Sequence, residues 1–180
     1  MTSTQPVREL SSIEAGTLRK VCGLFVTGVT VITSGADACA AGTTVNSFTS
    51  VSLDPPLVLF CLHKDSRLAP VVEEFSTFAV NFLASPQAHI AWAFAGRNTA
   101  VVQDIPHRLS SGGLPILKGA LAFLACRVVN IVEGGDHSIF LGEVEELGLA
   151  PDVRDPLIFF RGQLGALEDD PRATHPIWDG

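Results

Sequence analysis

The sequence contains no tyrosine, no cluster of lysine and arginine, and no long apolar segment. A formal net charge of −7 without a basic cluster argues against a surface for nucleic acid or for an anionic membrane. Apolar runs such as PLVLFCL and ALAFLAC are too short to cross a bilayer. The N-terminal stretch MTSTQPVREL is polar and lacks the apolar core of a secretory signal, so we expect a soluble, cytoplasmic protein.

Several signatures of known chemistry are also missing. The four cysteines, Cys22, Cys39, Cys61 and Cys126, are scattered without a C-x-x-C pair, so the sequence suggests neither a disulfide framework nor a metal site. No G-x-S-x-G, H-E-x-x-H or G-x-x-x-x-G-K-[ST] motif supports a hydrolase or a kinase. Because the G-x-G-x-x-G fingerprint is absent as well, any nucleotide must be held by something other than a Rossmann turn.

Apolar side chains, in contrast, are abundant. Of the 180 residues, 47% are hydrophobic and only 17% are charged, and the mean hydropathy is +0.34. No linker divides the chain, which predicts a single domain over 1–180, with a core at about 20–167 and an acidic, proline-containing tail at 168–180. Part of the apolar excess is expected to lie in a subunit interface.

The hydrophobic pattern predicts few helices and many strands. A capping box at 11–14, followed by Leu18, Val21, Cys22 and Phe25, predicts an amphipathic helix. Two shorter helices are expected, one from Ser66 and one over 85–95, and residues 97–113 are expected to form a loop. The expected strands cover 28–34, 56–63 (an apolar run typical of a strand buried on both faces), 77–83, 120–132, 137–147 and 157–160. Without β-α-β alternation, this order favours a closed or nearly closed antiparallel barrel.

The stretch TTVNSFTSVS, at 43–52, is unusually polar for this chain. Its apolar residues Val45, Phe48 and Val51 recur every third position, which fits neither a strand nor a helix. Two interpretations remain open from the residues alone. The hydroxyls and amides line a binding site, or they form the solvated face of an edge strand.

Two short motifs complete the list of candidates. In HKDSR, Lys64, Ser66 and Arg67 surround the expected start of a helix, where an anion could bind; a solvated loop with a helix cap is the commoner case. In GGDH, the glycines and the aspartate suit a tight turn, which would leave His137 as an ordinary first residue of a strand.

Six segments occur in an order that resembles a known family. They are GVTVIT, TTVNSFTSVSLDPPLVLFCL, FAVNFLA, FAGR, GDHSIFLGEV and DPLIFFRG, and the resemblance around them covers about 25–167. The chain is similar to the short-chain flavin reductases, the reductase components of two-component flavin-dependent monooxygenases. The resemblance implies a mainly β fold with flanking helices: an antiparallel, Greek-key-like split β-barrel that forms a homodimer.

The resemblance also implies a reaction. A member of this family binds FAD or FMN, accepts hydride from NADH or NADPH, and passes reduced flavin to a separate monooxygenase; we favour FAD and NADH. This agrees with the chemistry of the side chains, none of which can accept a hydride, so that a cofactor must do so. A flavin-binding barrel without turnover and a related split-barrel oxidase acting on a small molecule are the alternatives.

The family pattern assigns roles to particular residues. His137 is expected to position the nicotinamide, with Phe160 and Arg161 as further neighbours of that ring. Two departures, Thr43 where the family commonly has Met and Leu164 where it commonly has Tyr, indicate altered aromatic cover on one side of the site. The residues expected to bind flavin, including its phosphate, are Thr43, Thr44, Val45, Asn46, Ser47, Phe60, Cys61, Leu62, Lys64, Ser66, Arg67 and Arg97.

Overall fold

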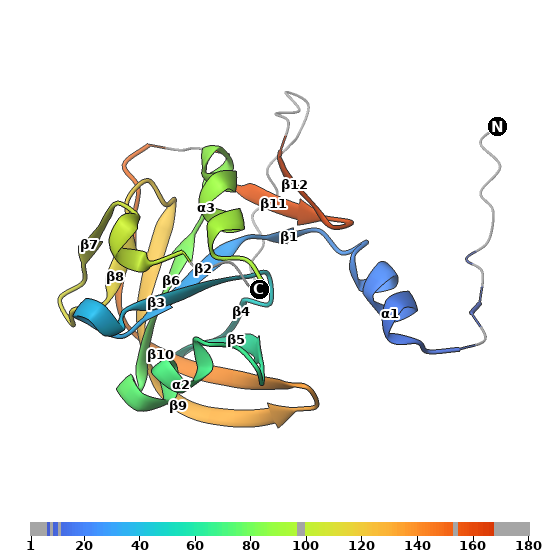
Figure 1. Ribbon diagram of the computed structural model, residues 1–180, viewed down its shortest axis with the longest axis horizontal. Coiled ribbons are helices and arrows are strands. Elements are labelled where there is room, and N and C mark those ends of the chain that lie inside the picture. The colour runs from blue at the N-terminus through green and yellow to red at the C-terminus, as the bar shows by residue number, and fades with distance from the viewer. Residues whose placement is uncertain (1–6, 8, 11, 97–99, 153–154, 168–180) are drawn as a thin grey trace.

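A curled antiparallel sheet forms the body of the protein (Figure 1). The computed structural model describes residues 7, 9–10, 12–96, 100–152 and 155–167. Within this part of the chain the large sheet has seven strands in the order β3-β2-β6-β9-β10-β5-β4. These strands are β2 (Thr30–Ser34), β3 (Ala41–Val45), β4 (Thr49–Leu53), β5 (Pro56–His63), β6 (Thr77–Phe82), β9 (Ala122–Gly134) and β10 (His137–Leu149). The expected mainly antiparallel β fold is confirmed.

The two edges of this sheet meet, so the sheet closes into a barrel. β3 and β4 lie at opposite edges of the strand order, yet only residues 46–48 separate them in the chain. The four residue steps from Val45 to Thr49 reach about 14 Å at most, so the edges must be neighbours in space. The polar stretch of the sequence is therefore an interrupted strand, and its interruption at 46–48 is the seam of the barrel.

Alternate residues of the strands fill the interior. Phe60 is fully buried and stacks on Phe140, with ring centroids 5.1 Å apart. The ring of Phe78 meets the ring of Phe60 edge-on, with centroids 4.8 Å apart. In β5, Val58, Phe60 and Leu62 are buried, whereas the residues between them are partly exposed. The expectation that this strand is buried on both faces was wrong. Among the described residues, no second layer covers its other face, which lies partly along a groove and partly at the protein surface.

Helix α3 (Ala88–Ala93) meets the free edge of β3 at its C-terminal end, where the carbonyl of Phe94 accepts from the backbone N–H of Thr44. It follows a 3₁₀ turn, η2 (Ser85–Gln87), as the Ser-Pro signal suggested, and ends before Gly96, whose φ of +62° favours glycine. The Phe94 ring packs directly on the backbone of β3, because a Cβ on Gly42 would lie only 3.1 Å from it. Helix α2 (Ala69–Phe75) adds Ala69 and Val72 to the barrel core, and its N-cap residue Leu68 is buried there as well.

Two small sheets complete the fold. One contains β1 (Thr27–Gly28), β11 (Leu157–Phe160) and β12 (Gln163–Ala166); the other pairs β7 (His107–Leu109) with β8 (Pro115–Leu117). The 3₁₀ turn η1 (Asp37–Cys39) lies between β2 and β3, and η3 (Val102–Asp104) lies between α3 and β7. The expectation of an unstructured loop was wrong for β7, because long-range bonds hold this hairpin: buried Asn81 accepts from the backbone N–H of Leu117 at 2.8 Å.

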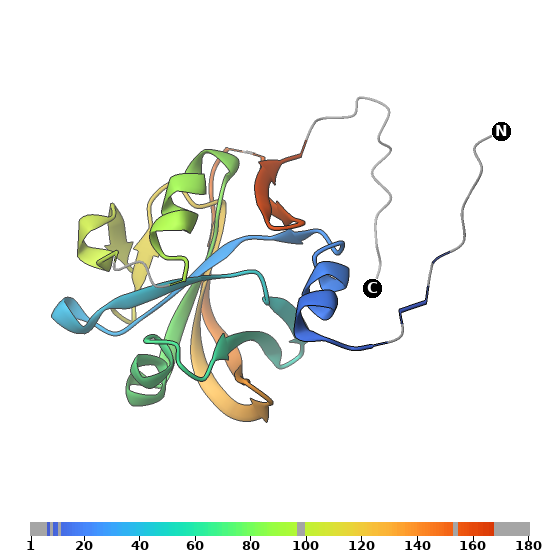
Figure 2. The same ribbon diagram turned by 45° about the vertical axis from the view of Figure 1, so that its right-hand side comes forward.

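Helix α1 (Ala15–Cys22) lies at one side of the barrel, beside β1 and the β11–β12 hairpin (Figures 1 and 2). The amphipathic helix expected here is confirmed, but none of its residues is buried, and Leu18 and Val21 are each 52% exposed. Glu14 is its N-cap and makes no side-chain cap hydrogen bond. Among the described residues, no helix is long and apolar enough to span a membrane. The tail at 168–180 lies outside the described residues.

Candidate active site

A groove opens at the seam of the barrel, between β3, the end of β5 and the start of β10. Its larger part is a cavity of about 570 Å³, and a second cavity of about 330 Å³ continues it past Thr43 and Ser66 toward Arg67. We call the two together the groove. The residues lining its larger part are Thr43, Thr44, Val45, Asn46, Ser47, Cys61, Leu62, His63, Asp65, Ser66, Gly96 and His137.

The two threonines of β3 tie the groove to α3. The Thr44 hydroxyl donates to the carbonyl of Ala91 at 2.7 Å, and the backbone N–H of Thr44 donates to the carbonyl of Phe94 at 3.1 Å. The Thr43 hydroxyl reaches the same Phe94 carbonyl at 3.4 Å. Because the proton of each hydroxyl is donated to the carbonyl of Ala91 or Phe94, the lone pairs of its oxygen remain to accept hydrogen bonds from a ligand.

Ser47 closes the seam through Cys61. Its Oγ accepts from the backbone N–H of Cys61 at 3.0 Å and donates to the carbonyl of the same residue at 3.1 Å. Burial raises the pKa of the Cys61 thiol, and the hydrogen bond with Ser47 partly offsets this. At neutral pH Cys61 is therefore an uncharged thiol beside the groove, and not a thiolate nucleophile.

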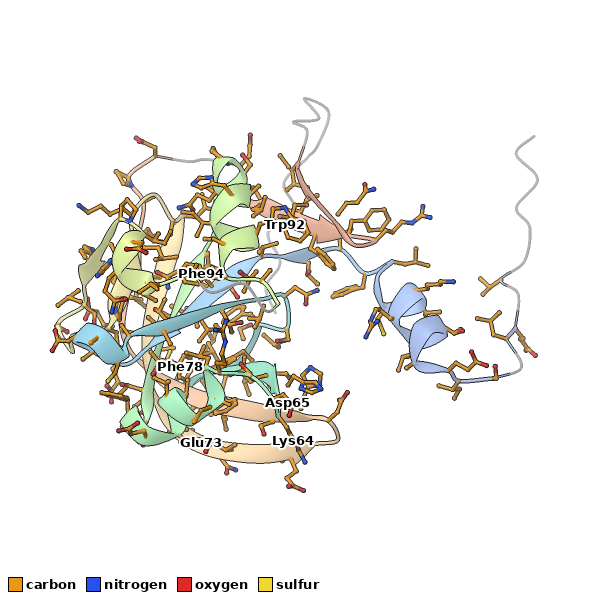
Figure 3. The ribbon with its side chains drawn as sticks, viewed as in Figure 1. Lys64, Asp65, Glu73, Phe78, Trp92 and Phe94 are labelled. Atoms are coloured by element: carbon orange, nitrogen blue, oxygen red, sulfur yellow. The ribbon has the colours of Figure 1, made fainter. Side chains whose placement is uncertain are left out.

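The HKDSR loop brings Ser66 and Arg67 to the groove but directs Lys64 elsewhere. The Ser66 hydroxyl accepts from the backbone N–H of Leu68 at 3.3 Å, but the N-cap of α2 is Leu68 and not Ser66, so the helix begins two residues later than the sequence suggested, at Ala69. Lys64 does not line the groove; its Nζ lies 3.6 Å from Glu133 Oε1, near the tip of the β9–β10 hairpin (Figure 3). Of the two cations expected to bind phosphate, only Arg67 is placed to do so.

His137 lies at the rim of the groove with a second histidine beside it. The register of β5 and β10 sets His137 directly opposite His63, and the ring centroids are 5.2 Å apart in an edge-to-face arrangement. His137 Nδ1 is 2.7 Å from Asp136 Oδ1, and this hydrogen bond lowers the pKa of Asp136. Sequence reasoning missed His63, because only strand pairing reveals that the last residue of one strand faces the first residue of another.

Three other candidates, all among the described residues, do not meet in the groove. Phe60 lies in the barrel core, so its side chain cannot reach a ligand. Phe160 and Arg161 lie at the end of the β11–β12 hairpin, where Arg161 lines a separate cavity of about 740 Å³ against α1. Arg97 lies outside the described residues. Among those described, no group of His, Cys, Asp and Glu side chains could hold a metal ion.

The similarity of this chain to known proteins identifies its family and agrees with the barrel. A family model described as "Flavin reductase like domain" matches residues 22–168. This chain belongs to the flavin reductase-like family. It is 39% identical over 167 residues to the reductase subunit HsaB of a flavin-dependent monooxygenase from Mycobacterium tuberculosis, covering 92% of this chain and 88% of that protein.

Solved structures of the family share the fold. A nitrilotriacetate monooxygenase component B homologue from Mycobacterium thermoresistibile superposes with a TM-score of 0.85 at 38% identity, covering 91% of this chain and 92% of that one. The NADH:FAD oxidoreductase SgcE6 of Streptomyces globisporus, in complex with NAD and FAD fragments, superposes with a TM-score of 0.83 at 39% identity, covering 93% and 100%. The expected split barrel of the flavin reductases is thus confirmed.

The uncharged polar groups that line the groove suit the polar edge of a flavin. The ring of an oxidised flavin is flat and uncharged, with acceptors and one N–H along its polar edge, so neutral groups are suited to bind it. Thr43, Thr44, Asn46 and Ser47 are such groups, and the groove has the volume of a cofactor site. Arg67, in the narrower part, is of the right charge for a phosphate.

Proposed function

We propose that this chain is an NADH-dependent flavin reductase, which uses FAD or FMN and supplies reduced flavin to a separate monooxygenase. The family membership and the names of the relatives, a monooxygenase reductase subunit and an NADH:FAD oxidoreductase, support this function. The observation that carries the proposal is the groove, where uncharged hydrogen-bonding groups from β3 and the seam face two histidines from β5 and β10.

The flavin ring is assigned to the side of the groove formed by the seam. Thr43, Thr44, Val45, Asn46 and Ser47 border it on the β3 side, and Cys61 and Leu62 border it on the β5 side. When bound, the flavin supplies the ability to accept a hydride, which no side chain of this protein has. The residues themselves bind and orient the ring.

The flavin phosphate is assigned to Ser66 and Arg67. Both line the narrower part of the groove, next to Thr43, and a guanidinium can pair with phosphate oxygens in a bidentate manner. Asp65 lines the same part, so a carboxylate partly opposes an anion there. Lys64 is left out of the site, because its ammonium group is paired with Glu133.

The nicotinamide is assigned to the rim at His137. This residue belongs to both β10 and the groove, and its ring is held by Asp136, so it can fix one edge of a planar ligand. Phe160 and Arg161, which the family pattern placed near the nicotinamide, lie on the β11–β12 hairpin, and a small cavity of about 200 Å³ connects Asn46 of the groove with Phe159 of that hairpin. Neither Phe160 nor Arg161 lines that cavity or the groove, so the proposed nicotinamide site does not include them.

A homodimer is also part of the proposal. Leu18 and Val21 of helix α1, and Leu24 and Phe25 just after it, are 52–76% exposed, and an apolar face of this kind favours burial against a second copy. Light scattering on the purified protein tests this, with twice the mass of the chain expected. The cytoplasmic location expected from the polar N-terminal stretch remains a prediction.

Mixing the protein with NADH and an excess of FAD, and then of FMN, tests the reductase function. The nicotinamide absorbance is expected to fall only when flavin is present, and at a rate proportional to the protein concentration. No loss of the nicotinamide absorbance, together with tight flavin binding, would favour a carrier instead. Consumption of NADH that needs an additional small molecule, and not free flavin, would favour an oxidase or another direct reaction.

A further inference from the structure

The two histidines at the rim of the groove are held in opposite proton arrangements. His63 Nδ1 accepts a hydrogen bond from the backbone N–H of Asp65 at 3.1 Å. An amide N–H can only donate, so this nitrogen carries a lone pair and the proton of His63 lies on Nε2. The carboxylate of Asp65 is farther from the same nitrogen, at 3.7 Å, which is beyond hydrogen-bond distance.

His137 has the reverse arrangement. Its Nδ1 lies 2.7 Å from the Asp136 carboxylate, which can only accept when ionised, so the proton of neutral His137 lies on Nδ1. Its Nε2 then carries a lone pair. The hydrogen bond from the backbone of Asp65 thus makes His63 a donor at Nε2. The hydrogen bond to the carboxylate of Asp136 makes His137 an acceptor at Nε2.

Both rings are within reach of a ligand. Each lines the groove, and the side chains of His63 and His137 are 50% and 43% exposed. Facing residues on neighbouring antiparallel strands project from the same side of the sheet, which is why the rings meet 5.2 Å apart. The rim therefore offers a neighbouring donor and acceptor on two rigidly held rings.

A primary carboxamide carries the matching pair of groups, one carbonyl acceptor and one N–H₂ donor. We propose that His63 and His137 together recognise the carboxamide of the nicotinamide ring, with His63 Nε2–H donating to its carbonyl and His137 Nε2 accepting from its amide nitrogen. The assignment rests on the proposed function, since it needs a nicotinamide dinucleotide as the substrate. It gives His63 a positioning role in the same site.

Dinucleotide analogues that alter only the carboxamide test the two contacts separately. The acetylpyridine analogue keeps the carbonyl but replaces the N–H₂ group by methyl, so it loses the contact with His137. The thionicotinamide analogue keeps the N–H₂ group but has a sulfur, a poorer acceptor, in place of the oxygen, so it weakens the contact with His63. Binding of the oxidised forms to the flavin-loaded protein, measured by titration calorimetry, avoids turnover.

Asparagine variants remove one contact at a time and spare the supporting bond. The side-chain amide of Asn is separated from Cα by as many bonds as Nδ1 of His. His63→Asn can therefore still accept a hydrogen bond from the N–H of Asp65, two residues on, but its side chain is too short to replace Nε2. His137→Asn likewise keeps a donor for Asp136. His63→Gln, whose amide is as many bonds from Cα as Nε2, is the rescue variant, and His89→Gln, on an exposed residue of α3, is the matched control.

The wild type and the control are expected to bind each analogue about fivefold more weakly than the natural dinucleotide, the worth of one neutral hydrogen bond. In His63→Asn the penalty for the sulfur analogue should vanish while the penalty for the acetyl analogue stays, and His63→Gln should restore the wild-type pattern. In His137→Asn the reverse is expected, together with a raised KM for NADH and an unchanged flavin affinity.

Equal penalties in the wild type and in both asparagine variants would overturn the carboxamide assignment, as would the absence of any penalty in the wild type. These results are distinct from a failure of the proposed function. If the wild type turns over NADH and flavin but shows no analogue pattern, only the assignment of the histidines is wrong. If it shows no flavin-dependent turnover at all, the reductase function is wrong.

Discussion

Ser47 is bonded to both backbone groups of Cys61, accepting from its N–H at 3.0 Å and donating to its carbonyl at 3.1 Å. One hydroxyl thus takes the place of a strand pair at the point where β3 has ended and β4 has not yet begun. The barrel can be interrupted there without leaving two backbone groups unpaired. The interruption, in turn, creates the groove, because a continuous strand would fill it.

Replacing Ser47 by alanine is expected to destabilise the protein by about 1–3 kcal/mol, since both backbone groups of Cys61 lose their partner. Flavin affinity should fall in parallel, because the seam borders the groove. Urea unfolding and a flavin titration measure the two effects. Ser50→Ala, on an exposed residue of β4, is the control and should change stability by less than about 0.5 kcal/mol. A Ser47→Ala protein as stable as this control would contradict the bridging role.

Gly142 makes room for the ring of Phe78 inside the barrel. A Cβ at this position would overlap the tip of that ring, and the ring is fully buried with no free space to move into. Gly142→Ala is expected to lower the free energy of unfolding by about 1–3 kcal/mol. Gly28→Ala, where a Cβ would meet nothing within 4 Å, is the control. Thermal unfolding of both variants compares them, and equal midpoints would show that the core adapts.

Cys126 makes the protein sensitive to alkaline pH. Burial, and to a lesser degree the negative charge of Glu145, raises the pKa of its thiol from 9.0 to about 12. Between these values the unfolded chain loses the thiol proton while the folded protein keeps it, so stability falls as pH rises. The slope attributable to one proton is about 1.4 kcal/mol per pH unit.

Cys126→Ala is therefore expected to flatten the decline of stability above about pH 9, although it lowers stability at neutral pH by leaving a small cavity. Urea unfolding over a series of alkaline pH values measures the slope. The absence of tyrosine from the sequence simplifies the measurement, because no phenol titrates in this range. Cys22→Ala, at an exposed position, should keep the wild-type slope; equal slopes for all three proteins would exclude Cys126 as the cause.

Arg67 is expected to contribute to flavin affinity through the phosphate. Arg67→Ala should weaken the binding of FMN and FAD about tenfold, the worth of a charge-assisted hydrogen bond, and leave the affinity for riboflavin, which has no phosphate, nearly unchanged. Fluorescence titrations with the three flavins provide the comparison. Lys64→Ala removes a cation of the same loop that is paired with Glu133, and it should have little effect on any of them. A uniform loss for all three flavins would point to a general disturbance of the groove.

The barrel could largely be predicted from the sequence, since its strands are encoded locally. Runs of β-branched and apolar residues marked β2, β5 and β6, and the EGGD turn fixed the β9–β10 hairpin, whose Gly135 has a φ of +75°. The β7–β8 hairpin could not be predicted, because its three-residue strands carry no period. It is held by distant groups such as Asn81, whose pairing depends on the tertiary fold.

The site was predictable in part for the same reason. The polar stretch and the HKDSR loop are continuous in sequence, so Thr43, Ser47 and Ser66 could be named together. The pairing of His63 with His137 depends on the register of two strands, and the orientation of Lys64 toward Glu133 depends on the position of the β9–β10 tip. Neither can be deduced from composition or spacing. The exposed face of α1 was also unexpected, because periodicity shows that a helix has an apolar face but not what covers it.

A titration of the purified protein with FAD and FMN tests the central claim most directly, that the groove at the barrel seam holds a flavin. The account predicts saturable binding of one equivalent per chain, with quenched flavin fluorescence, and weaker binding when Ser47 or Arg67 is replaced by alanine. Flavin fluorescence that does not change at any protein concentration would contradict it.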